Sequence, residues 1–108
     1  MQKGEIKVRI NGSNWKVIVT DNKQELTDKY GHICKGTVSY RLSTIYLDNT
    51  VSRENAAHIL RHELTHIYLY ETQINDKDAY TEEELCEFTA IYGMRIVNKA
   101  NDILRRIR

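Results

Sequence analysis

The chain has 108 residues, of which 41% are hydrophobic and 29% charged, as expected for a soluble globular protein, and we expect one domain spanning residues 1–108. Its 16 Lys and Arg against 15 Asp and Glu give a net charge of +1, which argues against a dedicated nucleic-acid-binding protein. The absence of an apolar run long enough for a membrane span or a secretory signal, with only Cys34 and Cys86 as thiols, predicts a cytoplasmic protein without membrane contact.

The N-terminal half predicts strands. Apolar residues alternate with polar ones in "EIKVRINGSNWKVIVTD" (5–21), around turn-forming residues, so this segment predicts a β-hairpin. Residues 21–36 predict a short helical turn and a loop. The stretch "TVSYRLSTIYLDN" (37–49) is rich in β-branched and aromatic residues, which indicates one or two further strands, the later one centred on Ile45 to Leu47.

The C-terminal half predicts two helices. Ser52 is a suitable N-cap for a helix from about Arg53 to Glu71. A turn-rich connection follows over residues 72–80. Thr81 and Glu84 then have the spacing of a capping box before a long helix that reaches the C-terminal region. Strands followed by helices predict an α+β fold, with an N-terminal antiparallel sheet packed against both helices.

The first of these helices carries the pattern His62-Glu63-Leu64-Thr65-His66. Residues four apart share a helix face, and here that face also carries apolar side chains, so His62, His66 and Glu63 fall within the apolar stripe. A buried carboxylate without a partner is costly. A zinc ion (Zn2+) would resolve this cost, because both imidazoles can ligate it and Glu63 can reach a water bound to it. In the alternative, the histidines bond to backbone or water and Glu63 reaches solvent.

A catalytic zinc usually has a third protein ligand, and the start of the last helix offers Glu82, Glu83, Glu84 and Glu87. Glu84 is already assigned to the capping box. On a helical wheel Glu82 lies near the centre of the apolar face and Glu83 at its flank, so Glu82 is the preferred ligand and Glu83 the next. That apolar face is formed by Leu85, Ile96, Val97, Ala100, Ile103, Leu104 and Ile107.

These residues resemble the gluzincin metallopeptidases, in which a second helix after the H-E-x-x-H helix carries a glutamate ligand. Glu82 follows His66 by sixteen residues, and "EEELCEFT" matches the family pattern E-x-x-x-[DN]-x-F-[AG] at Glu82 and Phe88. Cys86 stands where the family usually has Asp or Asn. The resemblance covers residues 44 to 90 and is strongest to small ImmA/IrrE-like proteins, which occur on phages and integrative elements.

The resemblance implies a minimal zincin-like fold and a zinc endopeptidase. Zinc would be held by His62, His66 and Glu82, with Glu63 as the general base. The substrate would be a protein or peptide, such as a phage or mobile-element regulatory protein, paired along the strand at Ile45 to Leu47. The donor to the oxyanion is left open among Tyr70, Tyr80 and Tyr92.

Two alternatives are kept. The chain could be a zinc-stabilised module that binds a protein without cutting it. It could also resemble SprT-like proteases that act on DNA-bound proteins, although the near-neutral charge argues against this.

Overall fold

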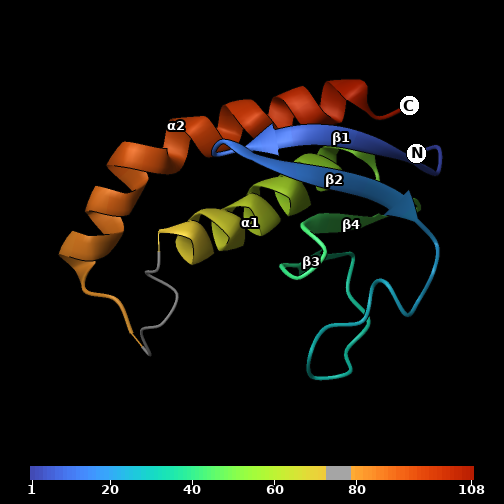
Figure 1. Ribbon diagram of the computed structural model, residues 1–108, viewed down its shortest axis with the longest axis horizontal. Helices are drawn as coiled ribbons and strands as arrows, with labels where there is room; N and C mark the ends of the chain where they lie inside the picture. The colour runs from blue at the N-terminus through green and yellow to red at the C-terminus, as the bar shows by residue number, and fades with distance from the viewer. Residues whose placement is uncertain (73–78) are drawn as a thin grey trace.

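The chain folds into a four-stranded sheet with two helices, in a computed structural model that describes residues 1–72 and 79–108 (Figure 1). The strands are β1 Gly4–Ile10, β2 Ser13–Thr20, β3 Gly36–Ser39 and β4 Thr44–Asp48, and the helices are α1 Arg53–Glu71 and α2 Glu82–Arg106. Buried side chains from the sheet and both helices join in one hydrophobic cluster, so the predicted α+β class is confirmed.

The N-terminal hairpin forms as predicted. β1 and β2 pair antiparallel, and the pair Ile10 and Ser13 closes a two-residue turn. Asn11 and Gly12 in that turn have φ values of 50° and 84°, the left-handed conformation that a type I′ turn requires at both positions. Trp15 and Val17 on β2 are buried while Lys16 between them is exposed, so the alternation turns one face of the hairpin to the core.

The prediction of an antiparallel sheet is wrong for its central pair. The strand order is β1-β2-β4-β3, and β2 runs parallel to β4, whereas the two outer pairs are antiparallel. Parallel neighbours need a connection of a dozen or more residues, and residues 21–43 supply it. Within that connection a series of turns is closed by a bridge between Thr27 and Ile33.

The strand order also corrects the position of the sheet edge. β4 has hydrogen-bonded neighbours on both sides, so the segment Ile45 to Leu47 is central, and β3 is the edge strand beside α1. An extended peptide can add only to an exposed edge. The segment Ile45 to Leu47, predicted to offer such an edge, is therefore not an edge strand, whereas β3 is.

Both helix starts are capped as predicted. The Ser52 hydroxyl accepts a hydrogen bond from the Asn55 backbone N–H at 3.2 Å. Thr81 and Glu84 form a reciprocal capping box, with distances of 3.1 and 3.2 Å. The connection predicted over residues 72–80 lies mostly outside the described residues.

Helix α1 buries a wider arc than a single apolar stripe. Leu60, Leu64 and Ile67 are fully buried, and Tyr68 is buried as well. Tyr68 is covered because α2 packs against α1 there, with the Tyr68 and Tyr92 rings 5.5 Å apart. Tyr70, in the last turn, is 46% exposed.

Helix α2 packs through its C-terminal half. Ile96, Ala100 and Ile103 are buried, whereas the first turns extend past the end of the sheet (Figure 1). Leu85 and Val97 were predicted on the packed face, but they are 51% and 38% exposed. Within the described ranges, no helix has both the length and the apolar character required to cross a bilayer.

The sheet comes close to α1 at Gly36, the first residue of β3. A Cβ atom at this position would overlap Cγ2 of Ile59 and would lie 3.5 Å from Cγ of Glu63. Only glycine allows β3 to come this near to the helix turn that carries the motif. Gly36 therefore sets the spacing between the edge strand and Glu63.

We expect Gly36→Ala to lower the free energy of unfolding by about 1–3 kcal/mol, as overpacking of a filled site does. Ile59→Ala removes the overlapping methyl group, so the double variant should lose less than the two single losses combined, measured as a double-mutant cycle in urea. Gly4→Ala is the matched control, because a Cβ atom there has nothing within 4 Å. Additive losses at Gly36 and Ile59 would contradict the contact.

Candidate metal centre and pocket

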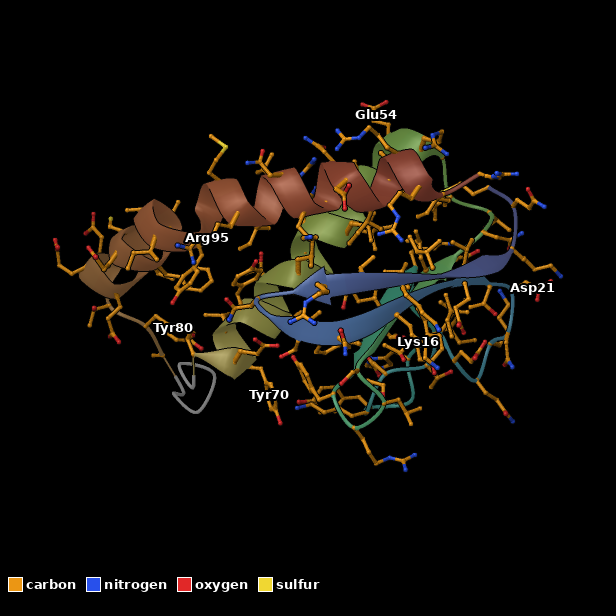
Figure 2. The ribbon with its side chains drawn as sticks, turned by 45° about the horizontal axis from the view of Figure 1, so that its top comes forward. Lys16, Asp21, Glu54, Tyr70, Tyr80 and Arg95 are labelled. Carbon is orange, nitrogen blue, oxygen red and sulfur yellow. The ribbon has the colours of Figure 1, made fainter. Side chains whose placement is uncertain are left out.

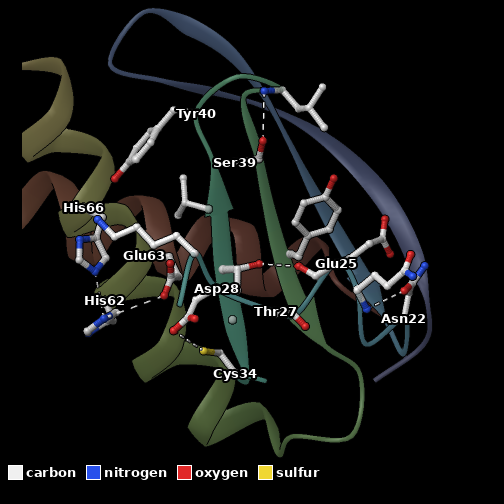
Figure 3. Close-up of a pocket in the computed structure, with 17 residues that line it drawn as sticks. Asn22, Glu25, Thr27, Asp28, Cys34, Ser39, Tyr40, His62, Glu63 and His66 are labelled. Atoms are coloured by element: carbon white, nitrogen blue, oxygen red, sulfur yellow. Dashed lines mark hydrogen bonds and ion pairs between the residues drawn. The ribbon is translucent and has the colours of Figure 1, made fainter. Parts of the chain in front are cut away.

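A pocket of about 750 Å³ opens between α1, β3 and the loop of residues 22–34. His62, Glu63 and His66 line it from α1, and all four residues of β3 line it from the sheet edge. The rest of its wall comes from the loop, from Tyr40 and Leu42 after β3, and from Tyr46 on β4 (Figure 3). The motif residues thus face a cavity large enough for a peptide segment.

The two motif histidines converge. Their Nε2 atoms are 3.2 Å apart, with ring centroids 4.8 Å apart and planes at 76°. Two nitrogen ligands of one tetrahedral zinc, each at about 2.0–2.1 Å, lie about 3.3 Å from each other. Without a metal, one Nε2–H donates to the other Nε2. The spacing therefore fits a shared zinc ion with little rearrangement.

The electrostatics of His66 favour the same role. Partial burial, with the nearby His62 and Lys29, lowers the pKa of His66 below its usual value. Each of these effects disfavours the positively charged imidazolium. His66 is therefore held neutral near pH 7, the form in which a histidine binds metal.

Glu63 is buried between the histidines and the core. It is 7% exposed, and its Oε1 atom lies 4.0 Å from His62 Nε2. No hydrogen bond to its carboxylate is found among the described residues. Burial raises the pKa of Glu63 to about 7. Glu63 is therefore mostly withdrawn from solvent and meets it only through the pocket that it lines, and its carboxylate can take up a proton near neutral pH.

The structure leaves the fourth predicted residue apart from the other three. Glu82 is exposed at the start of α2 and does not line the pocket, and Glu83 is also exposed. No group of three or more His, Cys, Asp or Glu side chains is placed to hold a metal in the part of the chain that the structure describes. Among the described residues, the site therefore consists of the two converging histidines and the Glu63 carboxylate.

Two pocket residues from the loop, Asp28 and Cys34, were missed by the sequence analysis. Asp28 Oδ1 accepts backbone hydrogen bonds from Tyr30 and His32, each at 2.9 Å, and the His32 bond is the main reason that the pKa of Asp28 is lowered. Its Oδ2 lies 3.6 Å from the Cys34 thiol, whose pKa is raised by burial and then by Asp28. No pattern in residues 21–36 pointed to this placement, because it follows from the tertiary fold.

The tyrosines that line the pocket, Tyr40 and Tyr46, were also missed. Tyr70, Tyr80 and Tyr92, the candidates for the oxyanion donor, are not among its lining residues; Figure 2 marks the first two near the C-terminal end of α1. Tyr92 packs against Phe88 and Tyr68. Tyr40 lines the pocket instead, stacked on Tyr70 with ring centroids 4.2 Å apart and planes at 14°.

Comparison with known proteins finds no match, whether among family models, curated proteins or solved structures. The resemblance to gluzincins thus rests on the motif residues, and function has to be argued from the pocket.

The raised pKa of Glu63 predicts how stability depends on pH in the zinc-free protein. Between the ordinary value of 4.5 and the folded value of about 7, the unfolded chain has released this proton and the folded chain has kept it. The contribution of Glu63 to stability should therefore fall by about 3 kcal/mol as pH rises through this window and then level off, while His66, whose pKa is lowered, contributes in the opposite direction.

Glu63→Gln should remove this fall, because the amide has no charge to bury, and should make the zinc-free protein more stable than wild type at pH 8. The measurement is urea unfolding from pH 4.5 to 8 with chelator present. Glu87→Gln, which changes an exposed carboxylate on α2, is the control and should keep the wild-type slope. If Glu63→Gln also kept that slope, Glu63 would not be the group whose burial makes stability depend on pH.

Proposed function

We propose that this protein is a zinc-dependent endopeptidase with a minimal zincin-like fold of the ImmA/IrrE-like type. The observation that carries the proposal is the pair of histidine Nε2 atoms at the spacing of two zinc ligands, beside a buried carboxylate with a pKa of about 7. A structural role for the pair would not require a proton acceptor of this kind inside a peptide-sized pocket. The substrate is a protein or peptide, such as a phage or mobile-element regulatory protein.

The zinc ion would be held by His62, His66 and Glu82. The two histidines fit it by geometry, and Glu82 is assigned by its place in the motif. The first turns of α2 contact the core through Phe88 and Tyr92, which are only partly buried, and the first fully packed residue is Ile96. A movement of the first turns of α2 toward the histidines would therefore disturb fewer buried contacts than a movement of the rest of the helix.

When bound, zinc would polarise the peptide carbonyl and make a water molecule more acidic. Glu63 takes a proton from the water as the oxygen forms a bond to the carbonyl carbon. It then passes this proton to the amide nitrogen, and the carbon–nitrogen bond breaks to leave a carboxylic acid and an amine. Glu63 lies beside His62 and lines the pocket, so its carboxylate is placed both to accept this proton and to donate it.

The substrate would lie extended along β3. The backbone of residues 36–39 forms no hydrogen bond outside its pairing with β4, as far as the described chain shows. The same four residues line the pocket beside Glu63. A peptide added to this edge gains backbone hydrogen bonds without side-chain specificity, and it is presented directly to the motif helix.

Zinc content is the first test. Wild-type protein purified without chelator should contain about one zinc per chain by elemental analysis, as a single site with three protein ligands requires. His62→Ala and His66→Ala should lose it, whereas His58→Ala, an exposed histidine on the same helix, should keep it. Glu82→Ala against Glu83→Ala decides the third ligand. Wild-type protein without stoichiometric zinc, even after zinc addition, would refute the site.

Cleavage is the second test, with the unfolded protein β-casein as the probe and mass spectrometry of its fragments. Glu63→Gln should keep the zinc and lose cleavage by at least about 100-fold, the contribution of a general base. Zinc loss in this variant would contradict the role of Glu63. Full zinc with no cleavage by the wild type would instead favour a zinc-stabilised binding module.

A further inference from the structure

The turn between β3 and β4 holds Tyr40 at the pocket. Tyr40 follows the last residue of β3, and its carbonyl accepts a hydrogen bond from the Ser43 N–H at 3.3 Å. One residue earlier, the Ser39 hydroxyl accepts from the Leu42 N–H at 3.2 Å. Ser43 has a φ of 48°, which closes the turn tightly. The backbone of Tyr40 is therefore fixed relative to the edge strand.

The ring of Tyr40 is held from the other side by α1. It stacks on Tyr70 in the last turn of that helix, with the centroids 4.2 Å apart and the planes nearly parallel at 14°. Offset stacks of this kind are favourable beyond the area they bury. Figure 3 shows the hydroxyl of Tyr40 pointing toward His66. The β3–β4 turn and the last turn of α1 thus orient the Tyr40 hydroxyl toward the motif.

The phenol also shares its surroundings with the general base. Burial raises the pKa of Tyr40, with further contributions from Glu63 and Tyr70. Tyr40 therefore remains protonated at neutral pH and is available as a hydrogen-bond donor. Tyr46 also lines the pocket, from β4. Burial raises the pKa of Tyr46, and the charge of Glu25 raises it further. The motif carboxylate, Glu63, is not among the groups that shift the pKa of Tyr46.

We propose that Tyr40 donates a hydrogen bond to the carbonyl oxygen of the scissile peptide as that oxygen gains negative charge, and that Tyr70 positions the Tyr40 ring. This inference rests on the proposed function. Donors fixed where charge develops accelerate a reaction because they need no reorganisation. Tyr40 meets this condition, since its backbone and its ring are each held by separate contacts.

The experiment uses zinc-loaded full-length protein and compares Tyr40→Phe with Tyr70→Phe, Tyr70→Ala and Tyr46→Phe. Phenylalanine preserves the stack and removes only the hydroxyl. Three quantities are measured for each variant: zinc content, kcat and KM on a peptide cut from β-casein, and calorimetric affinity for N-phosphoryl-Leu-Trp, a stable tetrahedral analogue. Folding of each variant is checked by its unfolding midpoint.

Tyr40→Phe should lower kcat by about 100- to 1,000-fold, as loss of one oxyanion donor does, with KM and zinc content unchanged. Affinity for the phosphoryl analogue should fall by at least about tenfold, since only groups that favour the tetrahedral state distinguish it from substrate. Tyr70→Phe keeps the stack, and both it and Tyr46→Phe should lower kcat far less than Tyr40→Phe does. Tyr70→Ala should lower kcat less than Tyr40→Phe does.

Three results would overturn the inference, and they can be told apart. If Glu63→Gln ends cleavage while Tyr40→Phe keeps wild-type kcat and analogue affinity, the proposed function stands and the role of Tyr40 does not. If zinc-loaded wild type neither cleaves β-casein nor binds the analogue, the proposed function fails and this inference fails with it. A loss of zinc or of folding in Tyr40→Phe, absent from Tyr70→Phe, would assign Tyr40 to structure alone.

Discussion

The arrangement depends on one unfavourable interaction, the burial of the Glu63 carboxylate. Its neighbours along α1, Leu60, Leu64 and Ile67, are fully buried, so the helix cannot be turned to expose Glu63 without exposing them. Gly36 brings the edge strand against the same helix turn. The packing of the hydrophobic core thus keeps the Glu63 carboxylate in a buried position that is unfavourable for its charged form. Burial of this kind raises the pKa of acidic groups toward neutral values.

Local patterns predicted the parts of the structure that depend on local physics. The hairpin turn at Asn11 and Gly12, the caps at Ser52 and Thr81, and the convergence of His62 and His66 all follow from backbone conformation or helix period. The direction of the β2–β4 pairing does not, because alternation is the same in parallel and antiparallel strands. The places of Asp28 and Tyr40 beside the motif depend on that pairing, so no local signal could reveal them.

The helical wheel of α2 shows a separate limit of sequence analysis. A wheel gives the direction of a side chain around the helix axis, but it does not say whether anything lies opposite. Glu82 and Leu85 share the inward direction with Ile96 and Ile103, yet the sheet ends before it reaches the first turns of α2. The predicted directions hold for Ile96, Ala100 and Ile103, where the helix is packed, with Val97 as the exception there, and the same pattern failed at Leu85, where the helix extends past the sheet.

The parallel pairing of β2 with β4 bears on the order of folding. The hairpin of β1 and β2 needs only its two-residue turn, and such hairpins form within microseconds. β2 can pair with β4 only after the chain of residues 21–43 has closed, which costs more entropy and takes longer. That chain carries β3, Tyr40 and the loop wall of the pocket. We therefore expect the pocket to be assembled late in folding, so that partly folded chains expose the histidines without yet having the cavity in which they would act.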